Sequence, residues 1–125
     1  MELTIDEALK QAVAAHKEGN IEEAEKFYQA VLGAQPQHPD ANHNLGVLAV
    51  GLKKVESALP YLKNALESNP QIGQFWLSYI DALTKLGQVS NARIAVSEAK
   101  KRGISDKHVE QLEMVLDANS KIYLH

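Results

Sequence analysis

The 125-residue chain contains no cysteine, which excludes disulfide bonds and thiolate chemistry and suits a reducing compartment. It also has no secretory signal at its start and no apolar run of about 18 residues, the length a helix needs to cross a bilayer. The formal net charge of −3 lacks the basic excess that nucleic-acid binding requires. We therefore expect a cytoplasmic protein that binds neither membranes nor nucleic acids.

Motifs for catalysis and metal binding are also missing from the sequence. There is no glycine-rich phosphate loop, no HExxH motif and no nucleophile elbow. The five histidines lack metal-ligand spacing. His38 and His43 are the closest pair, but Pro39 and a change from loop to helix separate them. We therefore expect no catalytic residues, no metal, no cofactor and no enzyme activity.

What the sequence does contain is an internal repeat of 34 residues. Alanine recurs at positions 24, 58 and 92, and residues of matching character recur in register with it. The other matching columns are Ala12, Gly46 and Ile80; Ala15, Ala49 and Leu83; Ile21, Val55 and Val89; and Tyr28, Leu62 and Val96. A unit of this length cannot bury its apolar face alone, so such units stack into a solenoid.

Each unit is predicted to contain two amphipathic helices joined by a short loop, and in the second unit these span roughly residues 40–52 and 55–68. Gly46 predicts close helix contact, because a mid-helix glycine costs about 1 kcal/mol relative to alanine and needs a packing reason. Gly19 and Gly87 are predicted to end helices with a positive φ. Phe75 and Trp76 are expected to fill the joint between the second and third units, with a ligand pocket as the alternative.

Three features predict where helices begin. Thr4 precedes Glu7 by three residues and Asn20 precedes Glu23 in the same way, so each polar residue is predicted to cap a helix through its side chain. Pro39 suits the first turn of the next helix, where the amide that proline lacks would have no partner.

These units resemble tetratricopeptide repeats, a family of helix–turn–helix modules with the same 34-residue period. The matching residues are Gly19, Ala24, Tyr28 and Pro36 in the first unit, Asn44, Leu45, Gly46, Ala58, Ala65, Leu66 and Pro70 in the second, and Trp76, Gly87, Ala92 and Ala99 in the third. The resemblance covers about residues 4–104. It implies an all-α fold, a right-handed α-solenoid of about seven helices in antiparallel pairs. We expect residues 1–125 to form one domain with repeats at about 5–38, 39–72 and 73–104.

After Gly103 the 34-residue pattern is predicted not to continue. If it did, Glu110, Glu113 and Asp117 would occupy core positions, so residues 105–118 are predicted to form a capping helix and not a fourth repeat. Ser105 is its expected N-cap, and its apolar stripe comprises Val109, Leu112, Val115 and Leu116. The tail at 119–125 has no assignment. It contains the apolar residues Ile122, Tyr123 and Leu124. Three roles remain open for them: packing back on the domain, binding a neighbour, or beginning a further segment.

In the tetratricopeptide repeat family, the first helix of each unit lines a concave groove that binds a peptide or helix of a protein partner. The resemblance and the helical spacing place ten residues in this groove: Leu9, Val13, His16, His43, Asn44, Val47, Val50, Leu77, Asp81 and Thr84. These side chains predict a mildly apolar groove. Some relatives clamp the terminal carboxylate of a chaperone with lysine, asparagine and arginine. Asn44 alone matches that set, and the other four positions hold Leu9, Val13, Gln74 and Ser78, so we expect no such clamp.

The leading hypothesis is a non-enzymatic protein-interaction module with a protein or peptide partner. Two alternatives remain open. Similar repeat blocks precede catalytic domains such as glycosyltransferases and sulfotransferases in bacteria, so the chain fits a substrate-positioning fragment of a larger protein. It also fits a homo-oligomer in which the groove or the last helix meets a second copy. The fold alone does not choose among these, because function lies in the site.

Overall fold

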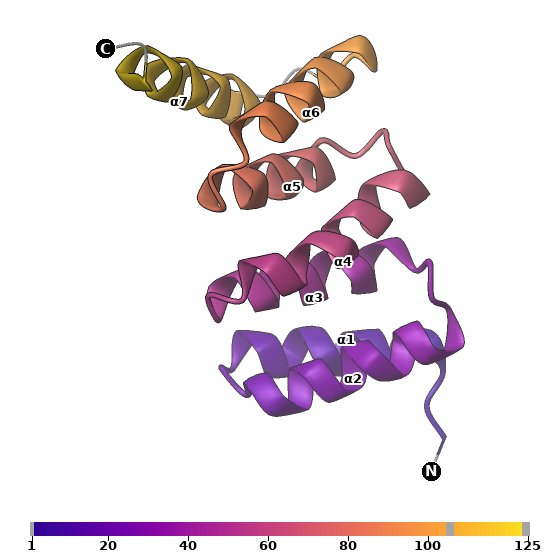
Figure 1. Cartoon of the computed structure of the whole chain (residues 1–125). Coiled ribbons are helices and arrows are strands. Elements are labelled where there is room, and N and C mark those ends of the chain that lie inside the picture. The colour runs from indigo at the N-terminus through magenta and orange to yellow at the C-terminus, as the bar shows by residue number, and fades with distance from the viewer. Residues whose placement is uncertain (1, 105–106, 124–125) are drawn as a thin grey trace.

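The computed structural model describes residues 2–104 and 107–123, and within these ranges the chain forms helices and no strands (Figure 1). The helices are α1 (Ile5–Lys17), α2 (Ile21–Ala34), α3 (Pro39–Gly51), α4 (Val55–Ser68), α5 (Gly73–Lys85), α6 (Val89–Lys101) and α7 (Lys107–Tyr123). The first six form three antiparallel pairs, which are α1 with α2, α3 with α4, and α5 with α6. This confirms the prediction of an all-α solenoid.

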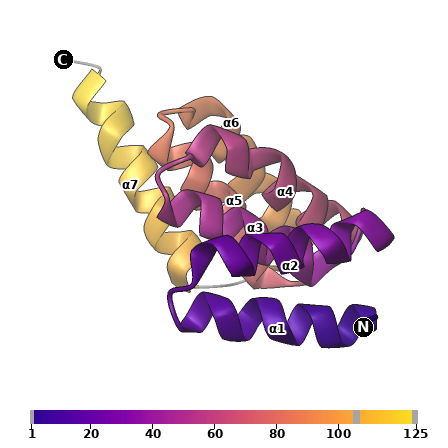
Figure 2. The same cartoon turned by 90° about the horizontal axis from the view of Figure 1, so that it is seen from below.

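The three pairs stack in chain order, with α7 at the far end of the stack (Figure 1). Helix α3 packs on α2, α5 packs on α4, and α7 packs on both α5 and α6. Seen along the stack, α7 runs at a steep angle to the other helices and projects past their edge (Figure 2). The apolar core therefore consists of layers between successive helix pairs, as expected for a repeat protein.

The 34-residue period continues into α7. The first helices α1, α3 and α5 begin 34 residues apart, at Ile5, Pro39 and Gly73, and the buried residues of α7 lie at the same offset from buried residues of α5. The prediction that the register is left beyond Gly103 is therefore wrong for the backbone, and α7 occupies the place of the first helix of a fourth unit. The register holds because Val109 and Leu116, the counterparts of Phe75 and Ala82, are apolar and buried.

Helix α7 is also longer than predicted. It continues to Tyr123, past the expected end at residue 118, because no glycine or proline follows to stop it. The segment that the sequence left unassigned is therefore helical as far as it is described. The predicted N-cap Ser105 and the residue Leu124 lie outside the described residues. The side chains of Ile122 and Tyr123 are likewise outside the description.

The helix starts confirm two of the three predictions. Thr4 Oγ1 accepts a hydrogen bond from Glu7 N at 3.1 Å while Thr4 N donates to Glu7 Oε1 at 3.0 Å, a reciprocal capping box. Pro39 is the first residue of α3. The prediction for Asn20 is wrong, because its Nδ2 donates to Glu23 Oε2 at 2.8 Å and its side chain accepts no backbone hydrogen bond.

The turns between paired helices use the left-handed backbone conformation that glycine favours. Gly19 has a φ of 79° and Gly87 a φ of 72°, as predicted. Lys53 occupies the same position in the second unit with a φ of 63°, although it has a Cβ. This conformation costs a non-glycine residue about 1–2 kcal/mol, so Lys53 is a strained point in the second unit.

The interior confirms the expected close contacts. A Cβ added to Gly46 would lie 2.5 Å from Cδ2 of Leu62, so α3 and α4 approach too closely for any larger side chain without movement. Phe75 and Trp76 are buried in the layer between the second and third units, as predicted. Trp76 Nε1 donates to the carbonyl oxygen of Pro70 at 2.8 Å, which satisfies its one polar atom.

Charged residues replace apolar ones where α7 meets α6. We use the name charged quartet for Arg93, Lys100, Glu113 and Asp117. Their counterparts 34 residues earlier all pack in or against the apolar core between the second and third units: Leu59, Leu66, Tyr79 and Leu83. At this end of the stack the helices therefore pack as they do between earlier units, but charged side chains take the place of apolar ones.

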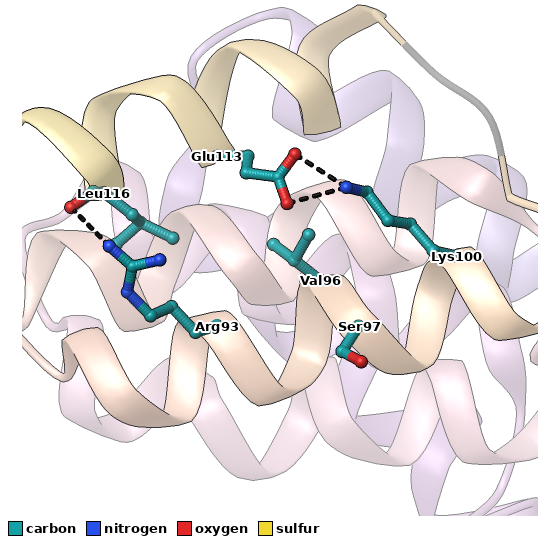
Figure 3. Close-up of a pocket in the computed structure, with 6 residues that line it drawn as sticks. All are labelled: Arg93, Val96, Ser97, Lys100, Glu113 and Leu116. Carbon is teal, nitrogen blue, oxygen red and sulfur yellow. Dashed lines mark hydrogen bonds and ion pairs between the residues drawn. The ribbon is translucent and has the colours of Figure 1, made fainter.

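The charged quartet is fully paired. Lys100 Nζ donates to both carboxylate oxygens of Glu113 at 2.7 Å (Figure 3). Arg93 Nη1 donates to Asp117 Oδ1 at 2.8 Å, and its Nη2 donates to the carbonyl oxygen of Leu116 at 3.0 Å. Arg93, Lys100 and Glu113 line a small hollow of about 180 Å³ beside Val96, and the two ion pairs join α7 to α6 (Figure 3). The carboxylates of Glu113 and Asp117 are thus accommodated where the earlier units have apolar side chains.

Candidate functional site

The first helices form the inner side of the stack. Helix α3 packs on α5 and α5 packs on α7, so the first helices from α3 onward approach each other directly. The second helices meet through long side chains, as where Gln29 Nε2 donates to Tyr61 Oη at 3.3 Å between α2 and α4. In a curved stack the side with the closer approach is the concave one. All ten predicted groove residues lie on α1, α3 and α5, and each is at least partly exposed.

The three predicted residues on α1 serve the N-terminal core as well as the surface. Leu9 and Val13 are half-buried and pack against the apolar cluster between the first and second units. His16 is half-buried, and its Nδ1 hydrogen-bonds to Tyr28 Oη at 3.4 Å with the two rings edge to face. The part of these side chains that remains for a ligand is therefore limited.

His43 links two units on the concave side. Its Nε2 and Ser78 Oγ hydrogen-bond at 2.7 Å, and its ring lies 4.9 Å from the ring of Phe75. Burial lowers the pKa of His43 below its usual value of 6.5, against the opposing effects of a hydrogen bond to Asn44 and the charge of Asp40. The imidazole is therefore neutral at neutral pH and works as a packing and hydrogen-bonding group.

Asn44 lies beside two titratable rings and affects both. Its side chain opposes the rise in the pKa of Tyr28 and the fall in the pKa of His43 that burial causes. An amide has two donors and two acceptor positions, so Asn44 has hydrogen-bonding capacity for a ligand. On the same helix, Val47 is 38% exposed and Val50 is half-buried.

The best-defined hollow on this face lies between α5 and α7, with a volume of about 430 Å³. We call it the α5–α7 cleft. Its lining is Gln74, Leu77, Ser78 and Asp81 from α5 and His108, Gln111, Leu112 and Val115 from α7. Clefts of 300–1,000 Å³ with apolar walls and a few polar groups are typical of ligand sites. The cleft therefore combines the size and chemistry that a bound side chain or short segment needs.

Only two of the ten predicted groove residues, Leu77 and Asp81, line this cleft. Thr84 lies on the same helix, but its Oγ1 donates to the carbonyl oxygen of Ile80 at 2.8 Å, a bond within α5. Seven other predicted residues do not line the cleft: Leu9, Val13, His16, His43, Asn44, Val47 and Val50. They lie on the preceding first helices of the same face.

The α7 side of the cleft was missed from the sequence. Gln111, Leu112 and Val115 are the counterparts of Leu77, Ser78 and Asp81 at the 34-residue offset. Applying the 34-residue offset once more would therefore have found these residues. The acidic residues of α7 concealed this signal, because they suggest that the repeat has ended. The concave face thus spans four helices, α1, α3, α5 and α7.

A larger hollow of about 460 Å³ lies between α4 and α6, on the side of the second helices. Its lining combines the polar Glu56, Lys63, Asn64, Gln88 and Asn91 with the apolar Leu59, Pro60, Tyr79 and Leu83. We take the α5–α7 cleft as the candidate site because it lies on the face of the first helices, where the predicted groove residues are. Across the described residues, no three His, Asp or Glu side chains are grouped so as to hold a metal ion, and no helix is both long and apolar enough to cross a bilayer.

A stack of helix pairs with a 34-residue period and an inner face of first helices defines a helical-repeat protein. A family model described as tetratricopeptide repeat matches residues 43–107, and a second with the same description matches residues 8–38. Because the first match alone spans more than half of the chain, the chain belongs to the tetratricopeptide repeat family. This confirms the resemblance seen in the sequence. A search of curated proteins finds no match.

Solved structures share the fold at low sequence identity. The first TPR domain of Spaghetti (RPAP3), bound to the HSP90 peptide SRMEEVD, is 18% identical, with a TM-score of 0.78 over 90% of each chain. The TPR2B domain of yeast Sti1 in complex with pHsp70 is 16% identical, with a TM-score of 0.82 over 92% of this chain and 97% of that one. MamA from Desulfovibrio magneticus RS-1 is 17% identical, with a TM-score of 0.82 over 94% of this chain and 67% of that one. At such identities the likeness shows the fold alone.

Proposed function

We propose that this protein is a non-enzymatic interaction module that binds a peptide segment of a protein partner on its concave face. The observation that carries the proposal is the α5–α7 cleft, where half-buried apolar side chains are flanked by hydrogen-bonding groups. Two of the solved structures with the same fold are complexes, one with an HSP90 peptide and one with pHsp70. Those partners are not carried over, because the identities are only 18% and 16%.

The chemistry of the face supports an extended peptide held by side-chain contacts. Val47 offers an exposed apolar surface on α3, and Leu77 offers another on α5. The amide of Asn44, on the same helix as Val47, has capacity to bond a peptide backbone. No lysine or arginine is among the residues that line the cleft, so a clamp for a terminal carboxylate is disfavoured.

The test is to select peptides from a display library against the wild-type protein and then to measure the best binder against two variants. Val47→Glu places a charge on the concave face and is expected to weaken binding about tenfold or more. Ile94→Glu is the matched control, since Ile94 is 61% exposed on α6, a second helix on the other side of the stack. Its affinity should equal that of the wild type.

Equal affinity in Val47→Glu and the wild type would contradict the concave face as the binding site. Equal loss in both variants would indicate a general effect of added charge or of instability. Circular dichroism of each variant separates the second case, because a folded variant keeps its helical spectrum. Sedimentation of the wild type alone then tests self-association as the remaining explanation.

A further inference from the structure

We propose that the α5–α7 cleft is an anchor site for a peptide that carries an aliphatic side chain next to a lysine or arginine, and that α7 is a binding wall as well as a cap. The inference rests on the proposed function and specifies the partner at its concave face. Three observations carry it: the shape of the cleft, its charge, and the way in which α7 is held.

The shape of the cleft fits one aliphatic side chain. Leu77 and Leu112 are half-buried against the C-terminal core, while Val115 is 47% exposed although it lines the hollow. An exposed valine at the edge of a cleft of about 430 Å³ is an apolar surface that an aliphatic ligand group would cover. Gln74, Ser78 and Gln111 supply donors and acceptors at the same site, which suits the backbone of an extended peptide.

The charge of the cleft favours a cationic neighbour for the aliphatic group. Asp81 contributes the only carboxylate among the lining residues, and no lysine or arginine lines the cleft. Asp81 is paired with Lys85 one turn along α5, but their side chains are 37% and 51% exposed, so the pair is weak and screened by water. A peptide cation can share this carboxylate, whereas a peptide carboxylate at the same place would be repelled.

The α7 wall is held in place independently of any ligand. Val109 and Leu116 are buried against the third unit, and the charged quartet joins α7 to α6 on the side away from α5. The residues that face the cleft therefore do not have to hold the helix. Because the wall is already in position, binding requires little ordering of α7.

The experiment uses three labelled pools of short random peptides with a fixed central pair, Leu-Lys, Leu-Glu or Ser-Lys. Fluorescence anisotropy measures the binding of each pool to the full chain. The Leu-Lys pool is expected to bind the wild type about tenfold more tightly than either other pool, a difference typical of one good side-chain contact. Comparable affinity for all three pools would overturn the inference.

Three variants then assign the effect to side chains. Asp81→Asn should abolish the preference for Leu-Lys over Leu-Glu. Val115→Gln should weaken the Leu-Lys pool several-fold, while Met114→Gln should not, because Met114 is adjacent and 69% exposed but does not line the cleft. Equal effects of Val115→Gln and Met114→Gln, or an unchanged preference in Asp81→Asn, would contradict the site.

The failures of the two proposals are distinguishable. If the pools bind without preference and Val47→Glu still abolishes binding, the concave face is a peptide site and the α5–α7 anchor is wrong. If no pool binds the wild type and no peptide is selected from the display library, both proposals are wrong.

Discussion

Gly46 offers the most direct test of the packing between paired helices. A Cβ at this position would lie 2.5 Å from Cδ2 and 2.7 Å from Cγ of Leu62, and 3.4 Å from the carbonyl oxygen of Ala58. Carbon atoms in contact prefer about 3.5–4.0 Å, so Gly46→Ala requires the Leu62 side chain to shift, or α3 and α4 to separate, by about 1 Å. Leu62 is fully buried, so such a shift disturbs the packing of the core around it.

Two effects of opposite sign determine the result. Overpacking costs about 1–3 kcal/mol, and the upper part of this range applies because Cγ as well as the tip of Leu62 is involved. Replacing a mid-helix glycine with alanine recovers about 1 kcal/mol of helix propensity. We expect Gly46→Ala to lower the free energy of unfolding by about 1–2 kcal/mol, and the melting temperature by roughly 4–8 °C.

Gly33→Ala is the matched control. Gly33 lies in α2 with no atom within 4 Å of the Cβ position, so this variant gains helix propensity without a clash. Urea titration followed by circular dichroism and by the fluorescence of Trp76, the single tryptophan, measures both variants. If Gly46→Ala were as stable as the wild type while Gly33→Ala gained stability, the close contact between α3 and α4 would be refuted.

Three further predictions follow from single residues. Lys53→Gly should raise the free energy of unfolding by about 1 kcal/mol, measured by urea titration, because glycine removes the strain of a φ of 63°. Burial lowers the pKa of His43 in the folded protein below its usual value of 6.5. The stability that His43 contributes is therefore full above pH 6.5 and is lost as the pH falls through the lowered pKa. Between about pH 7.5 and about pH 5.5, the melting temperature should fall less in His43→Gln than in the wild type. Leu116→Ala should speed hydrogen exchange in α7 and leave α1–α4 protected, since α7 packs mainly on α5 and α6 of the third unit. Equal loss of protection throughout would mean that the stack unfolds as one unit.

Features set by residues close in sequence were predictable from the chain alone. Gly46 gives room to Leu62 within one helix pair, and the capping box at Thr4 involves residues three positions apart. Asn20 shows the limit of this reasoning, because its side chain had two possible partners and bonds the Glu23 carboxylate instead of the backbone. The spacing was the same in both motifs, and only the local backbone conformation distinguishes them.

Features that depend on residues far apart in sequence could not be predicted in the same way. The charges of Glu113 and Asp117 signalled a departure from the repeat, whereas the structure pairs them with Lys100 and Arg93 on the preceding helix. The candidate site shows the same division. Helical periodicity placed Leu77 and Asp81 on the inner face, but the second wall of their cleft depends on where α7 docks, which no local pattern specifies.

The charged quartet also bears on whether the array can grow. A further helix laid over α6 and α7 would cover the charged quartet, just as α6 covers the apolar counterparts of these residues on α4 and α5. It would remove water from two ion pairs that are now partly exposed, and such desolvation costs several kcal/mol per ion. The charges at these four side chains therefore oppose growth of the solenoid by another unit, whether from the same chain or from a second molecule stacked end to end.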